Sequence, residues 1–163
     1  MSKWKTLLAI SLVFLVACQP TAETESDPGI SFQVSFSSAL TEESQDGRLL
    51  LMLSTLDENE PRFQVDNSPD TELIFGVNVS GWAPDSATVV DASAIGFPLR
   101  DLSEVPPGTY YAQVLLNRYK DFHLADGKTV SLPPDRGEGQ QWNRKPGNFY
   151  SVPVKVEIGT QGA

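Results

Sequence analysis

Short segments in which apolar and polar residues alternate follow one another along this chain, and they constrain its fold more than any other feature. In residues 152–158, valine or isoleucine occupies every second position, and proline or charged residues occupy the others. Residues 30–37, 72–80 and 109–119 alternate similarly, whereas residues 48–54 (RLLLMLS) form a continuous apolar run. Alternation with period two is typical of half-buried strands, and a short continuous run indicates a strand buried on both faces.

Further short extended segments are expected at residues 61–65, 87–90 and 129–132, and turns rich in Gly, Pro, Asp and Ser separate the segments. Only residues 41–45 and 99–104 could hold a helical turn. About seven or eight short strands without a sustained helical period predict an all-β fold, specifically a single immunoglobulin-like antiparallel β-sandwich. Because proline cannot donate to a strand ladder, Pro153 places the last strand at or near a sheet edge.

The inward positions of these strands predict the hydrophobic core. They are Phe32, Val34, Phe36, Leu51, Phe75, Val77, Val114, Leu116, Val154 and Val156. A Pro-Gly turn also leads into the strand that starts with Tyr110 and Tyr111. In immunoglobulin-like folds a tyrosine at such a strand start donates a hydrogen bond back to the preceding backbone, so we expect one of these two to be structural.

The amino terminus has the pattern of an export signal. Two lysines, Lys3 and Lys5, precede an apolar run of 11 residues at positions 7–17. A membrane-spanning helix needs about 20 residues, so the run has the length of a signal-peptide core instead. It ends at Leu15-Val16-Ala17-Cys18, which resembles the lipobox of bacterial lipoproteins. That resemblance implies removal of residues 1–17 and acylation of Cys18; an ordinary secretory signal is the alternative.

The residues after Cys18 predict a flexible tether and the membrane to which the protein is sorted. Residues 18–29 contain no large apolar side chain and are rich in Pro, Thr, Ser and acidic residues, so they predict a flexible tether. A domain at 30–158 and a tail at 159–163 follow. By the sorting pattern of diderm lipoproteins, Gln19 in place of Asp implies the outer membrane. No later run is long enough to span a bilayer, so the lipid on Cys18 is the expected membrane attachment.

Charge and composition exclude several classes of function. The chain carries a formal charge of −9, and removal of Lys3 and Lys5 with the signal leaves 10 basic against 21 acidic residues. Such a chain repels phosphate backbones, so no nucleic-acid partner is expected. One Cys and one His exclude an internal disulfide, a cysteine-based zinc site and a multi-histidine centre. We therefore expect no metal and no cofactor.

The sequence also lacks the motifs of common catalytic sites. It has no Gly-x-Ser-x-Gly elbow, no Walker loop, no Gly-x-Gly-x-x-Gly and no His-Glu-x-x-His. His123 is the one histidine that could serve a catalytic triad, and its neighbours indicate a strand-end residue that holds local structure. The acidic turn at residues 57–60 lacks the spacing of a calcium loop and indicates a solvated turn. No catalytic residue is predicted, and the chain is expected not to be an enzyme.

Residues 133–151 form the one long segment between predicted strands. They combine Trp142 and Tyr150 with the amides of Gln141 and Asn143, among other aromatic and polar residues. A loop of this length in a compact domain is either functional or packed as its own unit. Aromatic and amide side chains suit a sugar or peptide contact. They equally suit a loop that pins itself to the fold, so these four residues are the candidate ligand contacts under the first interpretation.

Several segments together resemble a known domain family. They are residues 47–51 (GRLLL), 60–63 (EPRF), 75–77 (FGV), 102–119 (LSEVPPGTYYAQVLLNRY), 122–127 (FHLADG), 138–143 (EGQQWN) and 145–151 (KPGNFYS). This set resembles the amino-terminal β-domain that precedes an esterase-type α/β-hydrolase domain in some bacterial secreted proteins. In that family the nucleophile belongs to the hydrolase domain, so the resemblance implies an accessory domain here and transfers no catalytic residue.

These observations favour a non-catalytic, lipid-anchored binding or accessory module of the bacterial cell envelope. Its expected partners are the membrane, through Cys18, and a separate hydrolase, a glycan or another envelope protein. Two alternatives stay open at this point: an esterase-associated enzyme component, and a purely structural envelope lipoprotein.

Overall fold

The computed structural model describes residues 29–135, 137 and 141–159. In this part of the chain the secondary structure is all-β apart from two short 3₁₀ helices. In chain order the elements are β1 (Phe32–Val34), β2 (Gln45–Ser54), η1 (Pro61–Phe63), β3 (Leu73–Trp82), β4 (Thr88–Val90), β5 (Ile95–Phe97), η2 (Leu102–Glu104), β6 (Gly108–Arg118), β7 (Lys120–His123), β8 (Thr129–Leu132), β9 (Phe149–Tyr150) and β10 (Val154–Ile158). The described part holds no helix long and apolar enough to cross a bilayer.

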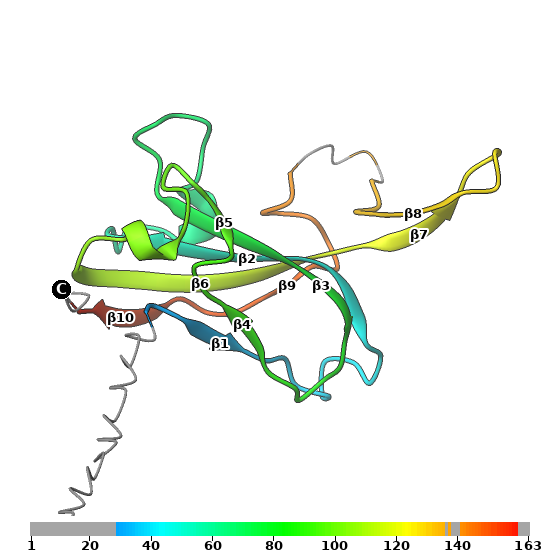
Figure 1. Ribbon diagram of the computed structural model, residues 1–163, viewed down its shortest axis with the longest axis horizontal. Coiled ribbons are helices and arrows are strands. Elements are labelled where there is room, and N and C mark those ends of the chain that lie inside the picture. Colours follow the sequence, from blue (N-terminus) through cyan, green and yellow to red (C-terminus); the bar gives the residue numbers. More distant parts are fainter. Residues whose placement is uncertain (1–28, 136, 138–140, 160–163) are drawn as a thin grey trace, which may run out of the picture.

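One large antiparallel sheet organises the molecule. Its strand order is β10-β6-β2-β3-β5, and β9 also pairs with β6, so β9 and β10 lie along one edge of β6. The two long neighbours β2 and β6 pair from Gly47 opposite Arg118 to Ser54 opposite Tyr111. A separate ribbon of β1 and β4 lies on one side of this sheet (Figure 1). The β7–β8 hairpin continues from the end of β6 and projects from the body.

The hydrophobic core lies between the large sheet and the β1–β4 ribbon, on what we call the inner face of the sheet. Leu49, Leu51 and Leu53 of β2 point to this face and are at most 1% exposed. Phe75 of β3 is fully buried beside them, and Phe32 and Val34 of β1 pack against the same cluster. The alternation in the sequence therefore correctly predicted which side of β2 and β3 is apolar.

Most of the predicted core residues lie in or against this cluster, with one exception. Phe36, Leu51, Phe75 and Leu116 are buried, and Phe32, Val34, Val77, Val114 and Val156 are partly buried against them. The prediction was wrong for Val154, which is 54% exposed. Val154 pairs with Ala112 and has the predicted orientation, but it lies where the sheet is not covered.

The tyrosine at the start of β6 confirms a structural expectation. The Tyr110 hydroxyl donates a hydrogen bond of 2.9 Å to the Pro106 carbonyl, four residues upstream. The ring itself is buried in the core, and burial raises the pKa of its hydroxyl. Tyr110 therefore fixes the turn before β6, as a tyrosine corner does, while Tyr111 points to the other face.

Local geometry corrects three other expectations. Residues 61–65 are not extended, because Pro61–Phe63 form a 3₁₀ turn in which the Phe63 and Gln64 amides donate to Glu60 and Pro61 carbonyls. Residues 41–45 hold no helical turn, whereas η2 lies inside the predicted 99–104 segment. The strands β5, β7 and β9 were not predicted; each is four residues or shorter. As predicted, β10 lies at a sheet edge directly after Pro153.

Candidate functional site

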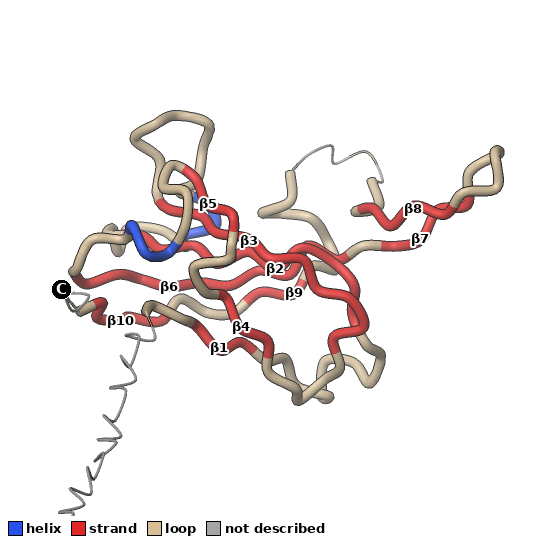
Figure 2. The backbone as a smooth tube through the Cα atoms, viewed as in Figure 1, coloured by secondary structure: helices blue, strands red, loops and turns tan. Residues whose placement is uncertain are grey.

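The face of the large sheet opposite the core, which we call the outer face, is built from both apolar and polar side chains. Met52 and Leu115 are at most 1% exposed there, and Gln113 beside them is 1% exposed. Pairing of Met52 with Gln113 and of Leu115 with Tyr150 places these side chains on one face of β2, β6 and β9. Figure 2 shows the loop between η1 and β3 on the side of the large sheet away from the β1–β4 ribbon.

A buried amide organises this face. Gln113 lies in the middle of β6, and its Nε2 donates to Glu60 Oε2 (2.7 Å) and to the Ser151 carbonyl (2.8 Å). Its Oε1 accepts from the Arg62 backbone amide at 3.1 Å. Gln113 therefore ties η1 and the segment after β9 to the sheet. Both polar atoms of the Gln113 amide therefore have hydrogen-bond partners within the protein, as a buried amide requires.

Arg62 is the second centre of the cluster. Its side chain is 10% exposed and its Nε donates to Glu60 Oε2 at 2.9 Å. Its Nη1 donates to the Asn143 carbonyl (3.2 Å), and the Asn143 amide Nδ2 returns a hydrogen bond to the Arg62 carbonyl (3.1 Å). The guanidinium is therefore held from both sides, by a carboxylate in its own turn and by the loop at 141–148.

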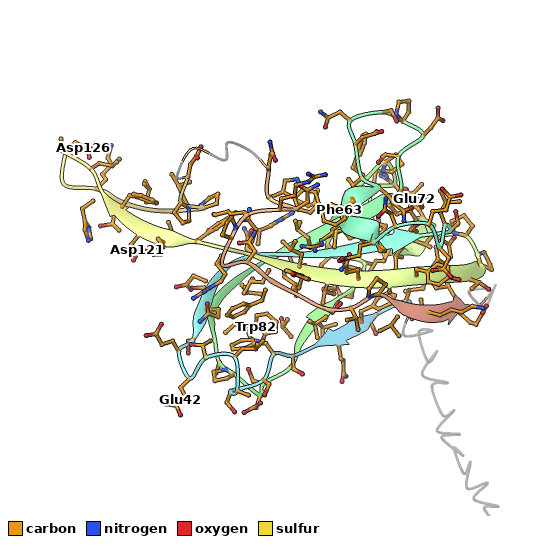
Figure 3. The ribbon with its side chains drawn as sticks, turned by 180° about the vertical axis from the view of Figure 1, so that it is seen from behind. Glu42, Phe63, Glu72, Trp82, Asp121 and Asp126 are labelled. Carbon is orange, nitrogen blue, oxygen red and sulfur yellow. The ribbon has the colours of Figure 1, made fainter. Side chains whose placement is uncertain are left out.

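Aromatic rings cover this guanidinium. Its central carbon lies 3.7 Å from the ring centroid of Tyr150 and 4.4 Å from that of Phe63. Tyr150 is nevertheless 55% exposed. Arg144, at the surface, lies 5.3 Å from the Phe63 ring. Cation–π contacts favour this stacking. Figure 3 shows Phe63 on the outer side of the sheet and Trp82 on the core side.

Glu60 carries the charge that balances Arg62. Hydrogen bonds from the Arg62 side chain, and next from Gln113, lower the pKa of the Glu60 carboxyl below its ordinary value. Glu60 is thus ionised at neutral pH and keeps the partly buried ion pair intact. We call Glu60, Arg62, Gln113, Asn143 and Tyr150 the outer-face cluster.

The four predicted contact residues have different surroundings in the structure. Asn143 and Tyr150 both touch Arg62, one by hydrogen bonds and one by its ring. Trp142 is half-buried, and its carbonyl accepts from Asn148 Nδ2 at 2.9 Å, so its backbone is part of the loop packing. Gln141 is exposed, and its carbonyl accepts from the Arg144 amide. The loop thus packs on the fold and still presents Tyr150. The predicted lipidation site, Cys18, lies outside the described residues.

The sequence did not identify Arg62, Glu60 or Gln113 as site residues. Their partners are 51 and 81 positions away in the chain, as in the pairs of Arg62 with Gln113 and with Asn143. The available signal was the polar residue Gln113 inside an otherwise apolar strand segment, which the alternation assigned to the face away from the core. His123 behaves as predicted: it ends β7, and its Nδ1 lies 2.9 Å from the Thr129 hydroxyl.

A separate cleft of about 350 Å³ lies where β6 passes into β7. Its lining includes Arg118, Tyr119 and Lys120 from the chain at that junction, and residues 145–148 from the long loop. The loop singled out in the sequence therefore helps to line this cleft, but with residues other than the four predicted contacts. Tyr150 lines a different, smaller cleft of about 210 Å³ together with Phe36 and Trp82.

Comparisons of the chain with protein-family models, with curated proteins and with solved structures found no match. The resemblance to the β-domain of an esterase family therefore stays a prediction, and the functional argument rests on the geometry of this chain.

Proposed function

We propose that this chain is a non-catalytic binding module of the bacterial cell envelope, anchored by lipid at Cys18, and that its contact surface is the outer-face cluster around Tyr150. The observation that carries the proposal is the state of Tyr150. The residue is more than half exposed, yet its ring is held against a guanidinium that is itself fixed by Glu60 and Asn143. An aromatic side chain that is both exposed and immobilised loses little entropy on binding.

The chemistry of this surface favours a protein or peptide partner. Tyrosine and arginine are among the residues most enriched at the centres of protein interfaces. Tyr150 stacks on Arg62, and both Arg62 and Arg144 lie over the Phe63 ring. We therefore propose another envelope protein as the partner, with a separate hydrolase as one candidate. A glycan, which also stacks on exposed aromatic rings, is the competing ligand in the test below.

The fold we propose for the module is an immunoglobulin-like sandwich. Two features support it: the β1–β4 ribbon packs on the inner face of the large sheet, and Tyr110 makes the hydrogen bond of a tyrosine corner. In such folds, loops at the ends and edges of the sheets carry recognition while the core carries stability. The position of Tyr150 on the edge segment β9 agrees with that division.

The binding surface is tested by a photo-crosslinking residue in place of Tyr150 in the intact, exported protein, with the same residue in place of exposed Lys155 as the matched control. We expect a discrete protein adduct from position 150 and none from position 155. Tyr150→Ala should abolish co-purification of that protein, and circular dichroism should show that the variant is still folded. Adducts equal at both positions contradict the proposal, and an adduct to carbohydrate replaces protein by glycan as the partner.

The anchor is tested separately by Cys18→Ala. The support for lipidation is the sequence Leu15-Val16-Ala17-Cys18 at the end of an apolar run. We expect the variant to be unprocessed or released from outer-membrane fractions, because a lipid with two or more acyl chains is what holds the parent there. Processing and fractionation like the parent contradict lipidation and leave the binding surface untouched.

A further inference from the structure

We infer that the cleft at the junction of β6 and β7 binds a small oxyanion, the carboxylate or phosphate group of a ligand, with Arg118 as its principal contact. The inference goes beyond the proposed function, because the cleft shares no residue with the outer-face cluster. Its volume of about 350 Å³ is within the range of small-molecule sites.

The described lining of the cleft carries positive charge. Arg118 and Lys120 line the cleft, and none of its described lining residues is a carboxylate. The whole chain has 12 basic and 21 acidic residues. A second cleft of the molecule shows the opposite character, since Glu58, Asp66 and Asp70 are among its lining residues. Positive charge is therefore concentrated at one concave place in an acidic protein, which attracts anions there and repels them elsewhere.

Two hydrogen bonds and an aromatic ring hold the Arg118 side chain in place. Its Nε donates to Gln45 Oε1 at 2.5 Å, and its Nη1 donates to the Gly147 carbonyl at 3.2 Å. Its guanidinium lies 4.6 Å from the centroid of the Phe149 ring. Gln45 is 3% exposed, so a buried amide orients the arginine. The contacts to described residues use Nε and Nη1, while Arg118 also lines the cleft. A guanidinium that is oriented in this way suits oxyanions.

The loop that closes the cleft is equally well fixed. Asn148 is 8% exposed; its Oδ1 accepts from the Arg118 amide (3.1 Å) and its Nδ2 donates to the Trp142 carbonyl (2.9 Å). Gly147 has φ of 89°, a left-handed conformation that favours glycine, and its carbonyl faces Arg118. The walls of the cleft are therefore set before any ligand arrives, which lowers the entropic cost of binding.

The test uses the folded mature protein, with inorganic phosphate and glucuronate as probes at constant ionic strength. Amide chemical shifts of residues 118–120, 145, 147 and 148 report binding, and the two probes distinguish a phosphate from a carboxylate source. The paired variants are Lys120→Glu, in the cleft, and Lys155→Glu, on the exposed face of β10. The two variants have the same net charge, so a difference between them is local.

We expect saturable shifts confined to these residues for at least one probe. Lys120→Glu should weaken binding about tenfold or more, since it places a like charge beside the anion, while Lys155→Glu should bind as the parent does. Arg118→Lys keeps the positive charge but removes the planar guanidinium with its paired N–H donors, so it should also weaken binding about tenfold. Equal loss in Lys120→Glu and Lys155→Glu, or shifts spread over the whole surface, would show general screening and overturn the site.

Discussion

The two faces of the large sheet are stabilised by different kinds of interaction. The inner face is covered by aliphatic and aromatic side chains such as Leu51 and Phe75, which are fully buried. The outer face buries Met52 and Leu115 together with Gln113 and Arg62, whose polar groups bond to one another and to the long loop. The stabilisation from buried apolar area grows roughly in proportion to that area and does not depend on the orientation of the contacts. A buried polar network is stable only when its members are all paired.

This difference has consequences for how each face responds to change. On the inner face, the loss in stability should follow the volume removed, residue by residue. On the outer face, removal of one hydrogen-bonded side chain should leave the other buried polar groups without partners and loosen the loop that they hold. The outer face should also make a pH-dependent contribution to stability through Glu60, since its ion pair is part of the network.

The largest effect is expected on the inner face. Leu51→Ala removes a fully buried side chain from the centre of the core, and it should lower the free energy of unfolding by about 2–5 kcal/mol through lost burial and the cavity left behind. Urea denaturation followed by circular dichroism measures this loss. Lys155→Ala, at an exposed position, should change the stability by about 0.5 kcal/mol or less. If Leu51→Ala lowers the free energy of unfolding no more than Lys155→Ala does, the hydrophobic core does not lie on the inner face.

An intermediate effect is expected when the outer-face network is broken without changing its volume. Gln113→Leu removes the hydrogen bonds to Arg62, Glu60 and Ser151 and should cost about 1–3 kcal/mol, because these groups lose a buried partner. Hydrogen exchange should increase at residues 141–151 more than in β2. Faster exchange throughout the sheet, with no preference for the loop, would mean that the two faces are not distinct.

The smallest effect is expected from acid. The pKa of Glu60 is lower in the folded chain than its ordinary value of 4.5, so its contribution to stability is present above that value and is lost as the pH falls through the folded pKa. The stability difference between the parent and Glu60→Gln should therefore shrink below about pH 4.5. Urea titrations from pH 7 downwards measure it. A difference that is constant across this window would show that the Glu60 charge does not act through folding.

The alternation of residue types was sufficient to predict the long strands and the inner face, because burial on one side of a strand leaves a period of two in the sequence. The short strands β5 and β9 leave too few residues for a period. Residues 61–65 were misjudged because Pro61 suits both an extended segment and the first turn of a helix. Val154 was misjudged because alternation gives the direction of a side chain and not whether another layer covers it.

The candidate site was less accessible from sequence than the fold. Tyr150 and the loop were found because aromatic side chains are unusual in a long polar segment. Arg62 and Gln113 were not, because their roles depend on contacts between positions far apart in the chain. Arg118 likewise is oriented by distant residues, among them Gln45, which is 73 residues away. Residues that are made functional by tertiary contacts carry no local pattern.

The position of β10 at the end of the large sheet bears on the behaviour of the protein at high concentration. An edge strand is a template for pairing with a second chain, and exposed Val152 and Val154 would favour such pairing. Pro153 interrupts the backbone donors between them, and Lys155 places a charge directly after. We expect Pro153 and Lys155 to oppose edge-to-edge pairing, so that the segment can keep its apolar residues without promoting fibre formation.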